Sequence, residues 1–154
     1  MAEDQQNLTD GKGPFLWQRS ELSLFSNRIN LGFYLLRLSG SLFVWIGDES
    51  GGFSGLSVCV PSGDSKKNWH SSHIYSAGHS SPVASLGLHE ESLARKLGQR
   101  FGCPVYVSLS LPAELDAEWD LLNPCGQTTL SKEVETVLVE RMASFLNQFP
   151  LEVL

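Results

Sequence analysis

Two apolar segments separated by only two residues limit the folds that this sequence can adopt. Residues 33–38 read Phe-Tyr-Leu-Leu-Arg-Leu, and residues 41–46 read Ser-Leu-Phe-Val-Trp-Ile. Aromatic and branched side chains favour strands, so the Ser39-Gly40 dipeptide between the segments predicts a β-hairpin with a two-residue loop. Gly40 can adopt the positive φ angle that such a loop needs.

The short loop also predicts which residues face each other across the hairpin. Leu38 pairs with Ser41, and the following pairs are Arg37 with Leu42, Leu36 with Phe43, Leu35 with Val44, Tyr34 with Trp45 and Phe33 with Ile46. Alternate pairs point to opposite faces. One face carries Tyr34, Leu36, Phe43 and Trp45; the other carries Phe33, Leu35, Val44, Ile46 and Leu42 beside Arg37. Because both faces are apolar, we expect the hairpin to be covered on both sides.

Four more segments have the pattern of strands. Residues 22–26 alternate weakly, residues 56–60 form an apolar run that ends at Pro61, and residues 105–111 alternate without a break. Residues 82–86 form a further short candidate strand. Together with the hairpin, these segments predict about six strands in mostly antiparallel order.

Two segments have the periodicity of amphipathic helices. Residues 90–101 place apolar side chains on one stripe, with glutamates at the start and basic residues near the end, as the helix dipole favours. After an acidic loop at residues 112–126, we expect a second helix that is capped by Ser131 and ended by Pro150. Its apolar stripe contains Val134, Leu138, Met142, Phe145 and Phe149.

Two segments lack the apolar side chains of a packed core. Residues 1–14 contain only Leu8 as a large apolar residue, so we expect a flexible tail. Residues 62–81 contain seven serines and three histidines, so we expect a mostly disordered insertion. Residues 15–154 otherwise predict one α+β domain, with two amphipathic helices on a mostly antiparallel six-stranded sheet or sandwich. The helices can cover only one sheet face, so the other is covered by a sandwich or by a second chain.

Composition limits the partners that such a domain can bind. The 154 residues carry a net charge of −6, which argues against a basic surface for nucleic acid or anionic lipid. The apolar runs are far shorter than the ~20 residues of a membrane helix. The polar N-terminus lacks the pattern of a secretory signal, and the spacing of Cys59, Cys103 and Cys125 fits reduced thiols. We therefore expect a protein of the cytoplasm or nucleus.

Four side chains have the residue types of a zinc site, namely Cys59, His70, His73 and His79. Zinc ligands need ordered supporting residues, and a flexible serine-rich segment supplies few. We therefore expect solvated histidines, no bound metal and no cofactor. His89, just before the first helix, is expected to be a surface or capping residue.

Acidic residues alternate around Trp119. They are Glu114, Asp116, Glu118 and Asp120. The calcium-loop pattern with its central glycine is absent, so a solvated acidic loop is favoured over a cation site. A docking loop for a basic partner is the alternative. Since no nucleophile, base and oxyanion site come together in the sequence, we expect a binding protein and not an enzyme.

The hairpin string at residues 37–47, Arg-Leu-Ser-Gly-Ser-Leu-Phe-Val-Trp-Ile-Gly, resembles the central hairpin of the proteasome assembly chaperone 4 family. Residues 82–85 resemble the Pro-Val strand of that family. Residues 93–97 and 105–108 resemble its helix and next strand, and Arg141 with Phe149-Pro150 resembles the end of its last helix. The resemblance extends over residues 22–150, and the hairpin is its distinctive part. The sequence departs from the family at residues 62–81, in the N-terminal tail and around Trp119.

The resemblance implies a non-catalytic chaperone that pairs with a related subunit, proteasome assembly chaperone 3. The pair would help α-subunits of the 20S proteasome assemble into a ring. We hypothesise that the hairpin face with Tyr34, Leu36, Phe43 and Trp45 packs against this partner, because Tyr and Trp give large contact areas. The alternative is that these four residues belong to the chain's own core.

Two other classes of function remain open on the sequence alone. One is a small hydrolase or metal-dependent enzyme that uses the His-rich segment. The other is a scaffold that recruits membrane-traffic or signalling proteins.

Overall fold

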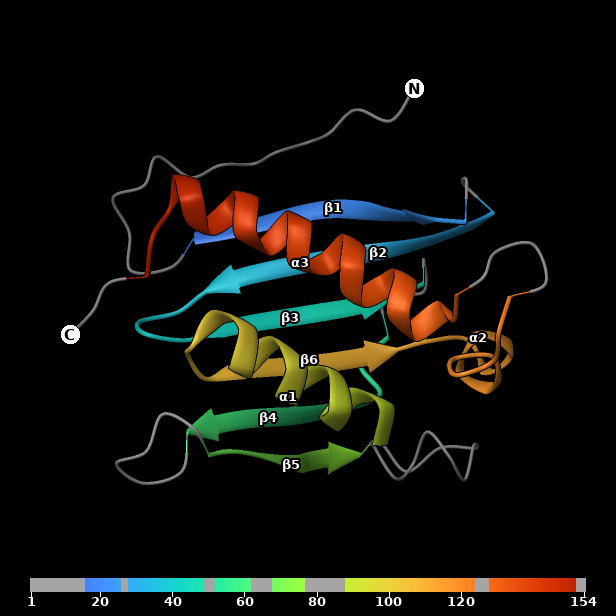
Figure 1. Cartoon of the computed structure of the whole chain (residues 1–154), viewed down its shortest axis with the longest axis horizontal. Coiled ribbons are helices and arrows are strands. Elements are labelled where there is room, and N and C mark those ends of the chain that lie inside the picture. Colours follow the sequence, from blue (N-terminus) through green and yellow to red (C-terminus); the bar gives the residue numbers. More distant parts are fainter. Residues whose placement is uncertain are drawn as a thin grey trace.

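A computed structural model describes residues 16–25, 28–48, 52–61, 68–76, 88–123 and 128–151. These residues form one six-stranded sheet with the strand order β1-β2-β3-β6-β4-β5, together with three helices (Figure 1). The strands are β1 (Leu16–Leu24), β2 (Ile29–Arg37), β3 (Leu42–Gly47), β4 (Gly55–Pro61), β5 (Trp69–Ser76) and β6 (Val105–Ser110). The helices are α1 (Leu88–Phe101), α2 (Ala113–Ala117) and α3 (Leu130–Gln148).

The predicted hairpin is formed by β2 and β3, and its register is confirmed. Phe33 lies opposite Ile46, and Arg37 lies opposite Leu42. The Leu38 N–H donates a hydrogen bond of 2.9 Å to the Ser41 carbonyl. Gly40 has a φ of 74°. The two-residue loop therefore determines the faces of both strands.

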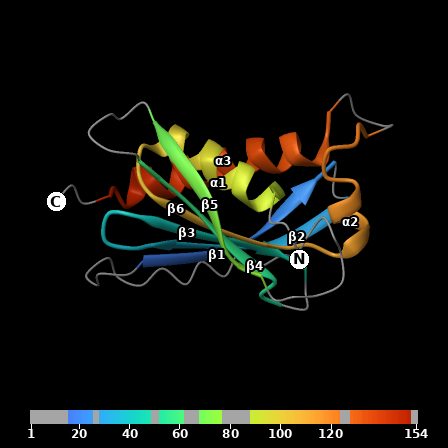
Figure 2. The same cartoon turned by 90° about the horizontal axis from the view of Figure 1, so that it is seen from below.

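The sheet is mixed in direction but is mostly antiparallel, as expected. Only β3 and β6 run parallel to each other; the other neighbouring strands of the sheet are antiparallel. The chain leaves β3, forms β4, β5 and α1, and returns as β6 between β3 and β4. Both α1 and α3 lie on the same side of this single sheet (Figure 2). The sandwich that the sequence left open is therefore not the arrangement of the described residues.

The core lies between this sheet and the two long helices. The inward face of the hairpin is completely buried, and so are the central positions of both helices. Fully buried side chains include Phe33, Leu35, Val44, Ile46, Leu97, Leu138 and Met142. Each such side chain contributes about 1.5–3 kcal/mol to folding. Helix periodicity in the sequence therefore identified the stripes that face the sheet.

A close contact between α1 and the sheet depends on Gly98. A Cβ atom at this position would lie 2.9 Å from Cys59 Sγ and 3.1 Å from Cys59 Cβ. Both Gly98 and Cys59 are buried. The absence of a side chain at Gly98 thus lets the helix pack directly against β4.

A buried carboxylate also joins α1 to the sheet. Glu90 is 4% exposed. Its Oε1 accepts a 2.7 Å hydrogen bond from Ser57 Oγ and lies 3.2 Å from His73 Nδ1. Its Oε2 accepts a 2.9 Å hydrogen bond from the Leu109 N–H. Burial raises the pKa of Glu90, and these hydrogen bonds oppose the rise only in part.

A second polar contact joins the end of α3 to the hairpin. Arg37 is 9% exposed, and its Nη1 donates a 2.7 Å hydrogen bond to the carbonyl of Pro150. The two residues are far apart in the sequence. Because the donor is charged, this hydrogen bond is a strong one, and it ties the chain just beyond the end of α3 to the hairpin.

Several expectations are wrong in detail. Residues 69–76 of the expected disordered insertion form β5, which pairs with β4 with one register shift between Leu56 and Ser57. The acidic loop contains the short helix α2. Thr129 and not Ser131 caps α3, because its Oγ1 accepts the 3.2 Å hydrogen bond from the Lys132 N–H.

Other expectations differ in their bounds or fall elsewhere. The first strand begins at Leu16, well before residue 22, and extends to Leu24. The expected short strand at residues 82–86 and the expected tail at residues 1–14 lie outside the described residues.

Replacing Gly98 by Ala is expected to lower the free energy of unfolding by about 1–3 kcal/mol, because the added methyl group overpacks the contact with Cys59. Helix propensity alone predicts a gain of about 1 kcal/mol. Urea unfolding of G98A, C59A and the double variant measures the coupling between the two positions. If G98A changes the free energy of unfolding by the same amount in wild type and in C59A, the two positions are not coupled. The overpacking explanation is then wrong.

Replacing Glu90 by Gln is expected to change how stability depends on pH. Because the pKa of Glu90 is raised in the fold, the carboxyl favours folding below its ordinary value of 4.5, and this contribution is lost as pH rises through the higher folded value. The stability of E90Q relative to wild type should therefore increase as pH rises above 4.5. Urea unfolding across pH 4–8 measures it, with the exposed Glu140→Gln as control. Parallel curves for E90Q and wild type would contradict a raised pKa.

Candidate partner interface

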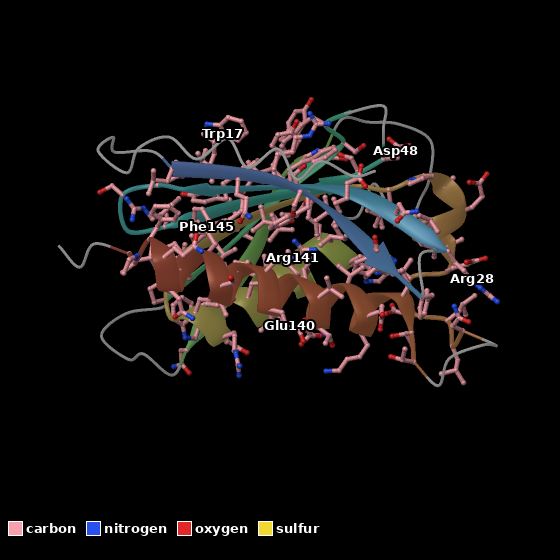
Figure 3. All side chains as sticks on the ribbon, turned by 90° about the horizontal axis from the view of Figure 1, so that it is seen from above. Trp17, Arg28, Asp48, Glu140, Arg141 and Phe145 are labelled. Carbon is pink, nitrogen blue, oxygen red and sulfur yellow. The ribbon has the colours of Figure 1, made fainter. Side chains whose placement is uncertain are left out.

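The sheet face opposite α1 and α3 is not covered by any helix of the described residues (Figure 2). We call it the open face. Figure 3 shows Trp17 of β1 on this side of the sheet. Phe145 of α3 lies on the opposite side, between the helix and the sheet. In strands, alternate residues share a face, so the partners of Trp17 across the sheet also belong to the open face.

The strand register aligns five apolar side chains in one row across the open face. Trp17 is paired with Leu36, Leu36 with Phe43, Phe43 with Tyr106, and Tyr106 with Val58. We call Trp17, Leu36, Phe43, Tyr106 and Val58 the open-face row. All five side chains are half-buried. The row extends over five neighbouring strands, from β1 to β4.

Tyr34 lies next to the open-face row, two residues before Leu36 on β2, and its side chain is accessible to solvent. It is 36% exposed, and its ring packs edge-on against Trp45 with the ring centroids 5.5 Å apart. The guanidinium of Arg19, a residue of β1, lies 5.5 Å from the centroid of the Tyr34 ring. A cation over the ring and an edge-on neighbour hold the phenol in a defined position.

Trp45 has a different environment from the other three hypothesised interface residues. It is only 9% exposed, and its indole N–H donates a 3.1 Å hydrogen bond to the Gly52 carbonyl. Its ring lies along Gly32 and Gly47, and a Cβ atom at Gly47 would clash with the indole. The chain itself therefore covers most of Trp45.

The structure thus brings Tyr34, Leu36, Phe43 and Trp45 to one face. Their accessibility differs: Tyr34 is exposed, Leu36 and Phe43 are half-buried, and Trp45 is buried. Contact with a partner stays a prediction for these four. Sequence reasoning missed Trp17, Val58 and Tyr106 as members of this face. The alternation of residues 105–111 placed Tyr106 opposite the buried side chains, but its neighbours depend on the order of strands in the sheet.

Among the described residues that were considered for zinc, namely Cys59, His70 and His73, no metal site is formed. His70 and His73 are three residues apart on β5, so their side chains point to opposite faces of the sheet. His73 contacts Glu90 and Ser57 on the helix-covered side, and Cys59 is buried against α1. His79 lies outside the described residues. Within the described ranges, no group of three or more metal-ligating side chains is found.

The contact of Ser57, His73 and Glu90 does not have the geometry of a nucleophile with its base. His73 Nδ1 lies 3.1 Å from Ser57 Oγ and 3.2 Å from Glu90 Oε1, so one nitrogen faces both groups. A catalytic relay uses the two different ring nitrogens. Ser57 is also completely buried. This cluster therefore holds α1, β4 and β5 together.

The described thiols are poor nucleophiles. Cys59 and Cys103 are both free and buried. Burial raises the pKa of Cys103 to about 11 and also raises the pKa of Cys59. The protonated thiol is unreactive. Cys125 lies outside the described residues.

His89 is part of a contact that the sequence did not predict. Its Nε2 lies 3.9 Å from Asp116 Oδ1, and its Nδ1 lies 3.7 Å from Asp120 Oδ2. Its ring lies against Trp119 with the centroids 5.7 Å apart. The residue is half-buried. The expectation of a surface or capping histidine is therefore corrected: His89 connects α1 to the acidic segment.

Comparison with solved structures identifies a similar fold. A chain of a yeast chaperone complex for 20S proteasome assembly superposes with a TM-score of 0.53. The match covers 86% of this chain and 96% of that chain, at 13% sequence identity. No curated protein matches the sequence.

Comparison with family models gives a match that includes most of the sheet. The model of proteasome assembly chaperone 4 matches residues 30–111. These residues extend from β2 to the end of β6, including the hairpin and the α1 helix. They are more than half of the 154 residues. The chain therefore belongs to the proteasome assembly chaperone 4 family.

Proposed function

We propose that this protein is a non-catalytic chaperone that pairs through its open face with a subunit related to proteasome assembly chaperone 3. The pair promotes assembly of the α-ring of the 20S proteasome, in the cytoplasm or nucleus. Membership of the proteasome assembly chaperone 4 family supports an assembly role. The similar fold in a yeast chaperone complex supports a second chaperone as partner.

The observation that carries the proposed pairing is the open-face row. Soluble monomers seldom display an aromatic and aliphatic row that extends over five strands. Aromatic residues at the centre of a flat surface are the typical anchors of protein interfaces. A sheet from a related chain can lie against this face at the usual spacing of ~10 Å between packed sheets. Two such chains would each cover the open face of the other.

Binding chemistry fits the described residues better than catalysis does. The serine–histidine–glutamate contact is buried and uses one histidine nitrogen, and the raised pKa values of Cys59 and Cys103 keep both thiols protonated. These features support a role that depends on surfaces. In the part of the chain that the structure describes, no helix has the length and apolar character of a membrane span.

Replacing Phe43 by Glu is expected to abolish pairing with the chaperone 3-like subunit, because it places a charge in the middle of the open-face row. The monomer should stay folded, since Phe43 is only half-buried in its own chain. Replacing Trp45 by Ala should instead destabilise the monomer by about 3–5 kcal/mol, because Trp45 is nearly fully covered. Isothermal titration calorimetry measures pairing, and circular dichroism with urea measures folding.

Glu140→Lys on the outer side of α3 is the matched control, and it should pair like wild type (Figure 3). Tyr34→Glu provides a second open-face variant at a more exposed position. If F43E and Y34E stay folded and pair with wild-type affinity, the open face is not the interface. If F43E unfolds but folded Y34E pairs normally, the row belongs to the core of this chain alone.

A further inference from the structure

The segment after β6 displays leucine side chains to solvent. Leu121 is 61% exposed and Leu122 is 68% exposed, which are the largest exposed fractions among the large apolar residues that the structure describes. Leu88, at the start of α1, is 56% exposed. His89, next to Leu88, contacts Asp120, so the start of α1 lies beside this segment. We call residues 113–122 the acidic ledge.

The acidic ledge is held in place by its own buried contacts. Trp119 is 3% exposed, and its carbonyl accepts a 2.9 Å hydrogen bond from the Ser131 N–H. Leu122 forms an antiparallel bridge with Thr129, ahead of α3. The backbone is therefore anchored on both sides of the exposed leucine pair. When a partner covers leucines on an ordered backbone, only their side-chain rotamers remain to be ordered, so the entropy cost of binding is smaller than for a disordered segment.

The charge of the acidic ledge specifies the kind of partner. Residues 113–122 contain four carboxylates and no Lys or Arg. Asp116 and Asp120 contact His89, whereas Glu114 and Glu118 are exposed in the same segment as the leucines. An exposed apolar pair at the end of an acidic segment is complementary to a surface that combines Lys or Arg with a shallow apolar recess.

The acidic ledge is also separate from the open face. It lies beyond the end of β6, where α2 projects from one end of the sheet (Figure 1). The open-face row crosses the sheet on the side away from α1 and α3. A partner on one surface therefore leaves the other accessible.

We propose that the acidic ledge is the surface that binds the α-subunit client, at a basic site of that subunit with an apolar recess for Leu121 and Leu122. This inference rests on the proposed function, which supplies the α-subunit as client. The carboxylates accelerate association and orient the client, and the leucines slow its dissociation. Such a small contact gives the weak, salt-sensitive binding that suits a chaperone which later leaves.

The test uses the full chain paired with its chaperone 3-like subunit, and it measures binding to each purified proteasome α-subunit by biolayer interferometry. The Leu121→Ser/Leu122→Ser variant should weaken binding to the client about tenfold or more. The Glu114→Lys/Glu118→Lys variant should reduce the association rate and the salt dependence of binding. Both variants alter exposed side chains, so circular dichroism and chaperone pairing should match wild type.

Ile74→Ser on β5 and Glu140→Lys on α3 are the matched controls, because they change an exposed apolar residue and an exposed acid elsewhere. Both should bind the client like wild type. Unchanged client binding by the two ledge variants would overturn this inference and leave the proposed function standing. If the wild-type pair binds none of the α-subunits, the proposed client is wrong and the inference falls with it. If the wild-type chain does not pair at all, the proposed function fails at its first step, as does the inference.

Discussion

The pairing of β2 with β3 is the interaction on which the other features of this molecule depend. The two-residue loop aligns Phe33 with Ile46 and Tyr34 with Trp45, and so assigns large apolar side chains to both faces of the central strands. The helices α1 and α3 cover one of these faces (Figure 2). A shift of one residue in register would exchange the two faces. The open-face row and the buried core are therefore two consequences of one register.

Polar contacts specify how α1 lies on the sheet. Glu90 is buried against Ser57 and His73, and Gly98 allows the helix to approach Cys59. A buried carboxylate costs stability unless its oxygens are hydrogen-bonded, and both oxygens of Glu90 are. The contact with His73 also explains why β5 joins the sheet although its sequence is polar. Its inward side chains meet polar groups on α1, including Glu91 and Arg95 through Ser71.

The two proposed binding surfaces differ in chemistry in a way that fits two kinds of partner. The open-face row is apolar and extends over five strands, which suits a lasting contact with a related chain. The acidic ledge is small and charged, which favours a contact that can be released. An assembly chaperone needs both properties, because it must stay paired while it binds its client and must then leave the assembled product.

Features that depend on neighbours along the chain could be predicted from the sequence alone. Period-two and helical patterns located β3, β4, β6, α1 and α3, and the loop at Gly40 gave the hairpin register. The order of the strands required the tertiary structure, since β6 enters between β3 and β4 from far along the sequence. That order aligns Tyr106 with Phe43, and the folded chain anchors β5 to α1 through His73. Local periodicity predicts which side of a strand is buried. It does not predict which distant residues cover that side, because those contacts form only when the whole sheet assembles.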